Sequence, residues 1–93
     1  MTLEEILENG NYHLIDVREE MELEMDGQIE KAQNIPLGEI EERKQEIINL
    51  EGPKIFFCRS GARSGRATQF FENQGLTDVY NGGGFEDVKA MLA

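Results

Sequence analysis

The segment from Lys54 to Phe71, KIFFCRSGARSGRATQFF, decides the fold of this chain. It opens with a short apolar run that ends at Phe57, and it closes with a stretch rich in helix formers. Serine and glycine residues separate the apolar run from the helix-forming stretch. The segment therefore predicts a buried strand, a short loop and a helix over residues 64–73. Cys58, the single cysteine of the chain, lies at the junction.

The rest of the chain continues this alternation of strands and helices. Apolar runs predict further strands over 13–17, 32–35 and 78–81. Helical spacing and capping residues predict helices over 3–8, 19–25, 38–49 and 86–92, and the glycines at 82–84 predict a turn. Alternation of this kind predicts βαβ units. We expect one α/β domain over residues 1–93, with a mostly parallel sheet of four to five strands flanked by helices on both faces.

Polar residues follow three of these strands directly. Asp16 and Arg18 follow the first strand, Cys58 follows the third, and the loop 81–84 follows the last. Open α/β sheets bind ligands beyond the carboxyl ends of their strands. We therefore expect the three segments to meet on one rim, with Cys58 at its centre.

The residues around Cys58 are typical of an anion-binding loop. If the loop curls round the thiol, its N–H groups point inward and can hydrogen-bond an anion on the sulfur. Gly61 and Ala62 keep the backbone accessible, and Arg59 and Arg63 stand on the rim. A thiol at a helix N-terminus beside arginines is expected to ionise readily. The loop is short, and it suits one extra sulfur atom better than a whole phosphate.

Composition excludes several other functions. The net charge is −10, and 15 of the 19 acidic residues lie in residues 1–51, which argues against nucleic acid or an anionic membrane as partner. One cysteine and one histidine cannot form a disulfide or a metal site. No apolar run could span a bilayer, and no leader precedes the first helix. We expect a cytoplasmic monomer, or a periplasmic one if a leader has been removed.

Four motifs together resemble the rhodanese (sulfurtransferase) family, in the single-domain form similar to phage-shock-protein-E-like proteins. They are LIDVR at 14–18, AQNIPL at 32–37, CRSGARS at 58–64 and the glycine pair at 83–84. Three positions depart from the family pattern: Gln28 replaces a histidine, Lys31 a glycine and Val88 a tryptophan. These positions are mainly structural in the family.

The resemblance implies sulfur transfer in two steps. Cys58 would attack the sulfane sulfur of thiosulfate, release sulfite and hold a persulfide, which a thiol, a protein acceptor or cyanide would then discharge. No metal or organic cofactor is implied. The residues expected to form the site are Cys58 as nucleophile, Arg59, Ser60, Gly61, Ala62 and Arg63 for substrate binding, and Asp16, Arg18 and Ser64 as supports.

Other functions remain open from the residues alone. Cys58 could be a small buried hydrophobe, and Arg59 and Arg63 could be surface residues. A cysteine phosphatase or arsenate reductase of the same fold would carry one more residue in the loop. A binding module without catalysis would usually lack the cysteine. A thiol redox sensor would need only an exposed cysteine of low pKa.

Overall fold

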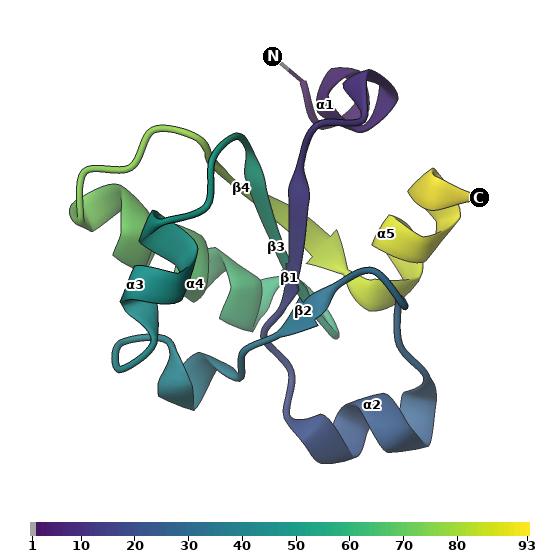
Figure 1. Ribbon diagram of the computed structural model, residues 1–93. Helices are drawn as coiled ribbons and strands as arrows, with labels where there is room; N and C mark the ends of the chain where they lie inside the picture. The colour runs from purple at the N-terminus through teal and green to yellow at the C-terminus, as the bar shows by residue number, and fades with distance from the viewer. Residues whose placement is uncertain (1) are drawn as a thin grey trace.

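The structure, a computed structural model, describes residues 2–93. Strands and helices alternate along the whole chain (Figure 1). In chain order the elements are α1 (Leu3–Asn9), β1 (His13–Asp16), α2 (Glu20–Asp26), β2 (Gln33–Asn34), the 3₁₀ helix η1 (Leu37–Glu39), α3 (Lys44–Ile48), β3 (Lys54–Cys58), α4 (Ala62–Asn73), β4 (Val79–Gly84) and α5 (Phe85–Leu92).

The strands form one four-stranded sheet in the order β2-β1-β3-β4, and every neighbouring pair is parallel. Strand β3 lies at the centre, paired with β1 from His13 to Asp16 and with β4 from Val79 onward. All five residues of β3 are buried, as expected for a strand covered on both faces. The predicted α/β class and parallel sheet are confirmed.

Each face of the sheet carries its own hydrophobic core. Phe56 points to the side of α3 and α4, where its ring stacks on Phe71 with centroids 5.4 Å apart. Ile55 and Phe57 point to the opposite side and pack with Phe85 and Val88 of α5. Successive strand residues point to opposite faces, so one apolar run in β3 supplies both cores. Figure 1 shows α3 and α4 on one side of the sheet and α1 and α5 on the other.

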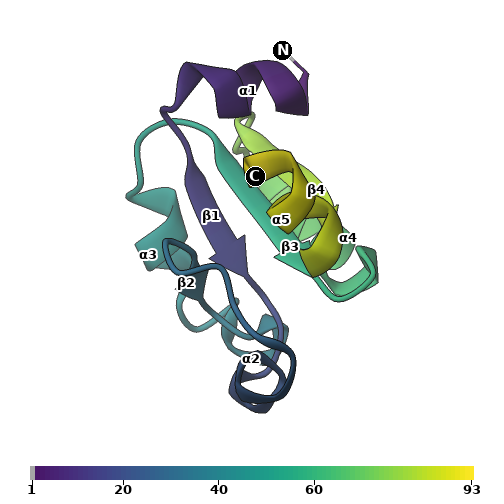
Figure 2. The ribbon, with the colours of Figure 1, turned by 90° about the vertical axis from the view of Figure 1, so that its right-hand side faces the viewer.

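Helix α2 occupies a different place, at the carboxyl ends of the strands. Figure 2 shows α1 near the amino ends and α2 at the opposite end of the molecule. None of the residues of α2 is buried, so it covers no core. Its position brings it beside the rim on which the sequence places the functional residues.

The predicted helix over 38–49 is divided in the structure. It consists of η1, a turn, and the five-residue helix α3. The intervening residues 41–43 are Glu, Glu and Arg, which offer no apolar side chain to hold a continuous helix on the core. Ile40 and Ile47 on either side are buried, and Arg43 pairs with both Glu39 and Glu46.

The predicted turn at 82–84 is also wrong, since these glycines form the end of β4. Phe56 pairs with Asn81 and Phe57 with Gly83, so Gly82 is the extra residue of a β-bulge. A Cβ on Gly82 would lie 2.8 Å from the Ile55 side chain, and one on Gly84 would lie 2.7 Å from the Arg59 carbonyl oxygen. Glycine is therefore needed at these positions, because β4 lies close to β3 and to the loop that follows β3.

Candidate active site at the head of helix α4

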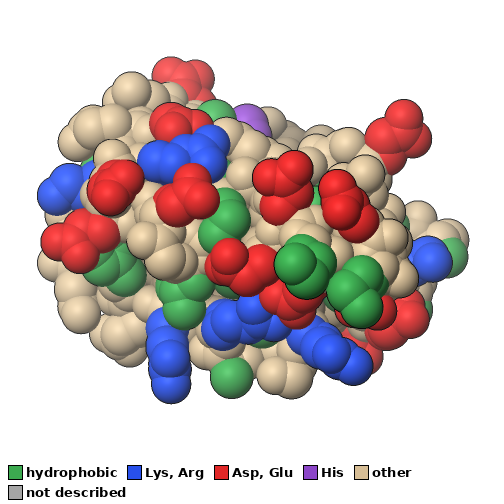
Figure 3. All heavy atoms as spheres, turned by 90° about the horizontal axis from the view of Figure 1, so that it is seen from below, with side chains coloured by type: hydrophobic (Ala, Val, Ile, Leu, Met, Phe, Trp, Pro, Cys, Tyr) green, Lys and Arg blue, Asp and Glu red, His purple; other side chains and the backbone are tan. Residues whose placement is uncertain are grey.

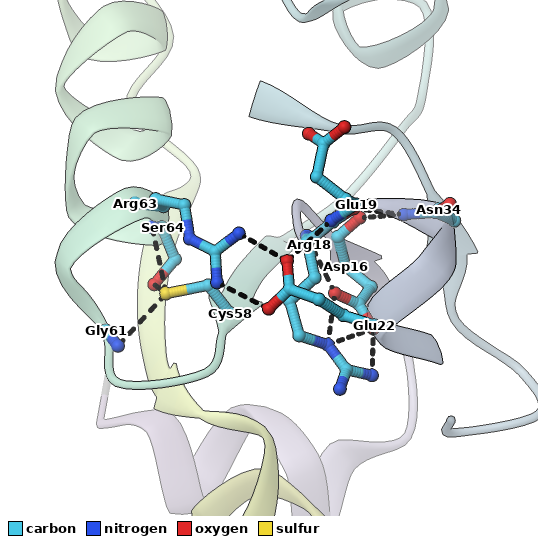
Figure 4. A network of polar contacts seen from close by, with 9 residues as sticks. All are labelled: Asp16, Arg18, Glu19, Glu22, Asn34, Cys58, Gly61, Arg63 and Ser64. Carbon is cyan, nitrogen blue, oxygen red and sulfur yellow. Dashed lines mark hydrogen bonds and ion pairs between the residues drawn. The ribbon is translucent and has the colours of Figure 1, made fainter. Parts of the chain in front are cut away.

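The three predicted segments meet at the carboxyl ends of the strands. Asn81 of β4 connects to the loop after β3, because its amide nitrogen donates to the Gly61 carbonyl at 3.1 Å. Arg63 reaches across from α4 to Glu22 of α2 (Figure 4). Figure 3 shows this face of the molecule, with basic side chains lying beside acidic and hydrophobic ones.

The sulfur of Cys58 is surrounded by hydrogen-bond donors. The main-chain N–H of Gly61 donates to Sγ at 3.0 Å and that of Ser64 at 3.4 Å. Burial raises the pKa of the Cys58 thiol, but hydrogen bonds from the Ser64 side chain and from the N–H groups of Ser64, Gly61 and Ser60 outweigh it, so that the pKa is lowered. The loop therefore favours a thiolate, as expected from its sequence.

The Ser64 hydroxyl lies between two partners. Its oxygen is 3.4 Å from Cys58 Sγ and 2.6 Å from Asn81 Oδ1. A hydroxyl has one hydrogen, so it donates to Asn81 while Cys58 is a thiol and can turn to the sulfur once a thiolate forms. Asn81 Oδ1 keeps a donor in either case, since the Gly83 N–H reaches it at 3.0 Å.

The backbone of the loop is held in a shape that needs glycine. Gly61 has φ +99°, and a Cβ there would lie 3.3 Å from Gly83 Cα. Helix α4 begins directly afterwards at Ala62, two residues before the predicted start. The side chains of Ser60 and Ala62 are exposed on the outside of the loop. Of these two residues, Ser60 acts on the sulfur through its main-chain N–H.

The two arginines of the loop lie in different surroundings. Arg63 donates from Nη1 and Nη2 to the two carboxylate oxygens of Glu22, at 2.6 and 2.9 Å. This pairing holds the pKa of Glu22 at about 2. Arg59 is exposed and makes no ion pair with residues 2–93. It borders a hollow of about 200 Å³ with Arg18, Asp26, Phe85 and Glu86.

Asp16 and Arg18 form a buried ion pair behind the rim. Arg18 Nε lies 3.0 Å from Asp16 Oδ1, and its Nη2 lies 2.7 Å from Oδ2. Both side chains are only 1% exposed, and the guanidinium stacks 4.3 Å above the Phe85 ring. Asn34 donates to the carbonyls of both residues. They fix the turn after β1 and do not contact Cys58, which places them as structural supports of the rim.

The sequence does not predict Glu22 as part of the site, and it places Asn81 on the rim only as part of the segment 81–84. Glu22 and Asn81 each contact the loop through a side chain, but no motif marks them. Glu22 is one of several acidic residues in α2, and Asn81 lies at the end of a predicted strand, beside the glycines that predict a turn. Only the three-dimensional arrangement shows which acidic residue meets Arg63.

The three departures from the family pattern are accommodated locally. Lys31 donates to the Tyr12 hydroxyl at 2.7 Å, on the α1 side of the molecule. Val88 is buried in the second core beside Gly82, and Gln28 is exposed. None of the three contacts the Cys58 loop. Among residues 2–93, no cluster of three metal-binding side chains occurs, and no helix is long and apolar enough to cross a membrane.

Comparison with known proteins gives a consistent result. Residues 2–91 match the family model described as rhodanese-like domain. The chain is 46% identical over 74 residues to the uncharacterised protein YqhL of Bacillus subtilis, covering 78% of this chain but only 57% of that protein. It is 32% identical over 77 residues to the thiosulfate sulfurtransferase PspE of Escherichia coli, covering 82% of this chain and 73% of PspE.

A solved structure supports the same assignment. The rhodanese with anions from E. coli superposes with a TM-score of 0.68 at 34% sequence identity, covering 82% of this chain and 89% of that one. The parallel sheet, the cysteine loop at the end of β3 and these similarities agree with one another. The chain belongs to the rhodanese-like domain family.

Proposed function

We propose that this chain is a sulfurtransferase that carries a sulfane sulfur as a persulfide on Cys58. The observation that carries the proposal is the convergence of the Gly61 and Ser64 N–H groups on Sγ, at 3.0 and 3.4 Å. These donors favour a negative charge on Sγ, which is the nucleophilic thiolate before sulfur transfer and the leaving thiolate afterwards. A packing cysteine would need no such arrangement.

Thiosulfate, or a donor of similar chemistry, is the proposed sulfur source. The Cys58 thiolate attacks the outer sulfur of thiosulfate, a new S–S bond forms, and the original S–S bond breaks with its electron pair leaving on sulfite. The product is a Cys58 persulfide anion in the same loop. The similarity to PspE, a thiosulfate sulfurtransferase, supports this choice of donor.

The second half of the cycle regenerates the free Cys58 thiolate. A thiophilic acceptor, such as cyanide or a thiol, attacks the terminal sulfur, and the Cys58 thiolate leaves with the bonding electrons. Cyanide becomes thiocyanate. The Gly61 and Ser64 N–H groups stabilise the anion on Cys58 at the start and end of each cycle, so the reaction needs no separate acid or base at the nucleophile.

Arg59 is the proposed anchor for the oxyanion of the donor. Its side chain follows Cys58 directly, is exposed and has no ion-pair partner among residues 2–93. Arginine binds tetrahedral oxyanions through paired N–H groups. Arg63 can contribute positive charge, although its guanidinium is already bound to Glu22.

A steady-state assay tests this function. Purified protein with thiosulfate and cyanide is expected to form thiocyanate, and Cys58→Ser is expected to abolish turnover. Arg66→Ala is the matched control, because Arg66 is an exposed arginine of α4 that makes no contact with the sulfur, and activity should be retained. Turnover that survives in Cys58→Ser, or no turnover in a protein whose thiol reacts normally, would refute the proposal.

A further inference from the structure

The Arg63–Glu22 ion pair places a carboxylate directly on one of the two arginines of the Cys58 loop, whereas Asp26 and Glu86 lie around the hollow beside the other, Arg59. The hydrogen bonds to Glu22 are the main cause that raises the pKa of Arg63, and the charge of the buried Cys58 thiolate adds to this effect. Figure 4 shows the Arg63 guanidinium between the sulfur and the Glu22 carboxylate. An anionic donor that approaches Arg63 therefore meets a negative charge that is already bound there.

This contact is strong enough to compete with a substrate. Two parallel N–H···O bonds of 2.6 and 2.9 Å form the most favourable geometry for a guanidinium and a carboxylate. The two side chains are 32% and 23% exposed, so the pair is only partly screened by water. With a pKa of about 2, Glu22 stays ionised throughout the neutral range.

A donor has two ways to meet this carboxylate. It can displace Glu22 from Arg63, which costs the ion pair, or it can bind on the Arg59 side and leave Glu22 in place. Both routes penalise a dianion such as thiosulfate more than a neutral sulfur compound, because the repulsion from Glu22 grows with the charge of the donor. Specificity then results from repulsion of one class of donor.

We propose that Glu22 is a specificity-determining residue, which weakens the binding of a dianionic donor such as thiosulfate relative to neutral or singly charged persulfidic donors at Cys58, so that thiosulfate is turned over with a raised KM. This role rests on the proposed function in one respect, since it concerns the donor for Cys58. The charge selectivity itself is a property of access to the thiol, and it can be measured without any sulfur transfer.

The first experiment compares two alkylating reagents of similar size, neutral iodoacetamide and anionic iodoacetate. The ratio of their rates with Cys58 measures charge selectivity, and effects of burial or mobility that slow both reagents cancel. Each rate is taken on the pH plateau, where the thiol is fully ionised in every variant. Glu22→Gln is expected to raise the iodoacetate-to-iodoacetamide ratio by about fivefold to tenfold, because one nearby negative charge is removed.

Two further variants isolate the ion pair. Glu24→Gln removes the same charge from the same helix, but Glu24 is exposed and pairs with no cation in residues 2–93, so the ratio should stay within about twofold of wild type. Glu22→Asp keeps the charge and should keep the low ratio. Since no residue of α2 is buried, these substitutions leave both cores intact.

The second experiment measures thiosulfate turnover in the same variants. Glu22→Gln is expected to lower the KM for thiosulfate several-fold with a smaller change in kcat, while Glu24→Gln should leave both unchanged. An unchanged ratio in Glu22→Gln, an equal rise in Glu24→Gln, or a raised KM would overturn the proposal, since Glu22 would then merely position Arg63 or add to the general acidity. If thiosulfate is not turned over at all, the proposed donor fails while the alkylation ratio still decides the role of Glu22.

Discussion

The main-chain N–H of Gly61 donates a 3.0 Å hydrogen bond to the sulfur of Cys58, three residues earlier in the chain. Gly61 itself adopts φ +99°, a left-handed conformation that directs the following chain into α4, where the Ser64 N–H also reaches the sulfur at 3.4 Å. The same residue lies against Gly83 of β4. Gly61 thus contributes both to the shape of the loop and, together with Ser64, to the lowered pKa of Cys58.

Replacing this glycine should affect both stability and reactivity. Gly61→Ala places a Cβ 3.3 Å from Gly83 Cα and forces a left-handed conformation on alanine, which costs about 1–2 kcal/mol. The strained loop should hold its N–H groups less well on the sulfur and raise the pKa of Cys58. Urea denaturation and the pH dependence of alkylation check the two effects. An unchanged pKa in a destabilised variant would contradict the account of the loop.

The pH dependence of Cys58 alkylation should reveal the Ser64 hydrogen bond. The lowered pKa of the thiol means that the rate with iodoacetamide rises with pH with a midpoint below the ordinary thiol pKa of about 8.5. Ser64→Ala removes a donor to the thiolate, so the midpoint should move to higher pH and the rate at pH 7 should fall. Ser60→Ala is the control, because only its main-chain N–H acts on Cys58, and the midpoint should not move.

The buried pair of Asp16 and Arg18 should matter chiefly for folding. Asp16→Ala leaves the Arg18 guanidinium buried without its carboxylate, and we expect a loss of about 3–5 kcal/mol in the free energy of unfolding. Glu46→Ala breaks an exposed ion pair with Arg43, which water screens, and should cost far less than the loss of Asp16. Urea titration of both variants gives the comparison. Equal losses would show that burial of the first pair contributes nothing.

Acid should weaken the Glu22–Arg63 ion pair, which links α2 to α4. The pKa of Glu22 is lowered from 4.5 to about 2 by Arg63, so its stabilisation is complete above pH 4.5 and is lost as the pH falls toward 2. The pair is partly exposed, and its contribution near pH 7 should be about 1 kcal/mol after solvent screening. The difference in unfolding free energy between wild type and Glu22→Gln should therefore shrink between pH 5 and pH 3. A constant difference would contradict the pairing.

Local sequence patterns predicted those features whose structure is determined by residues close together in the sequence. The strand ending at Cys58 is marked by consecutive apolar residues, and its burial on both faces follows from the βαβ alternation. The capping box of Thr2 and Glu5 predicted the start of α1, and both hydrogen bonds are present. The prediction that the loop N–H groups face the sulfur needed only the short spacing between Cys58 and Ser64.

Contacts between distant residues could not be predicted in this way. Glu22 and Arg63 are 41 positions apart, and nothing in the local pattern distinguishes Glu22 from Glu20 or Glu24 in the same helix. The glycines at 82–84 satisfy the rules for a turn as well as those for a bulged strand. The structure shows that these glycines belong to a strand, because Gly82 packs against Ile55 and Gly84 packs against the Arg59 carbonyl.

Intact-mass spectrometry without reductant tests the central claim most directly. Wild-type protein incubated with thiosulfate should gain the mass of one sulfur atom, cyanide should remove it, and Cys58→Ser should show no gain. This result would establish the Cys58 persulfide. No gain in a wild-type protein whose Cys58 is free and reacts with iodoacetamide would contradict sulfur transfer from thiosulfate at this site.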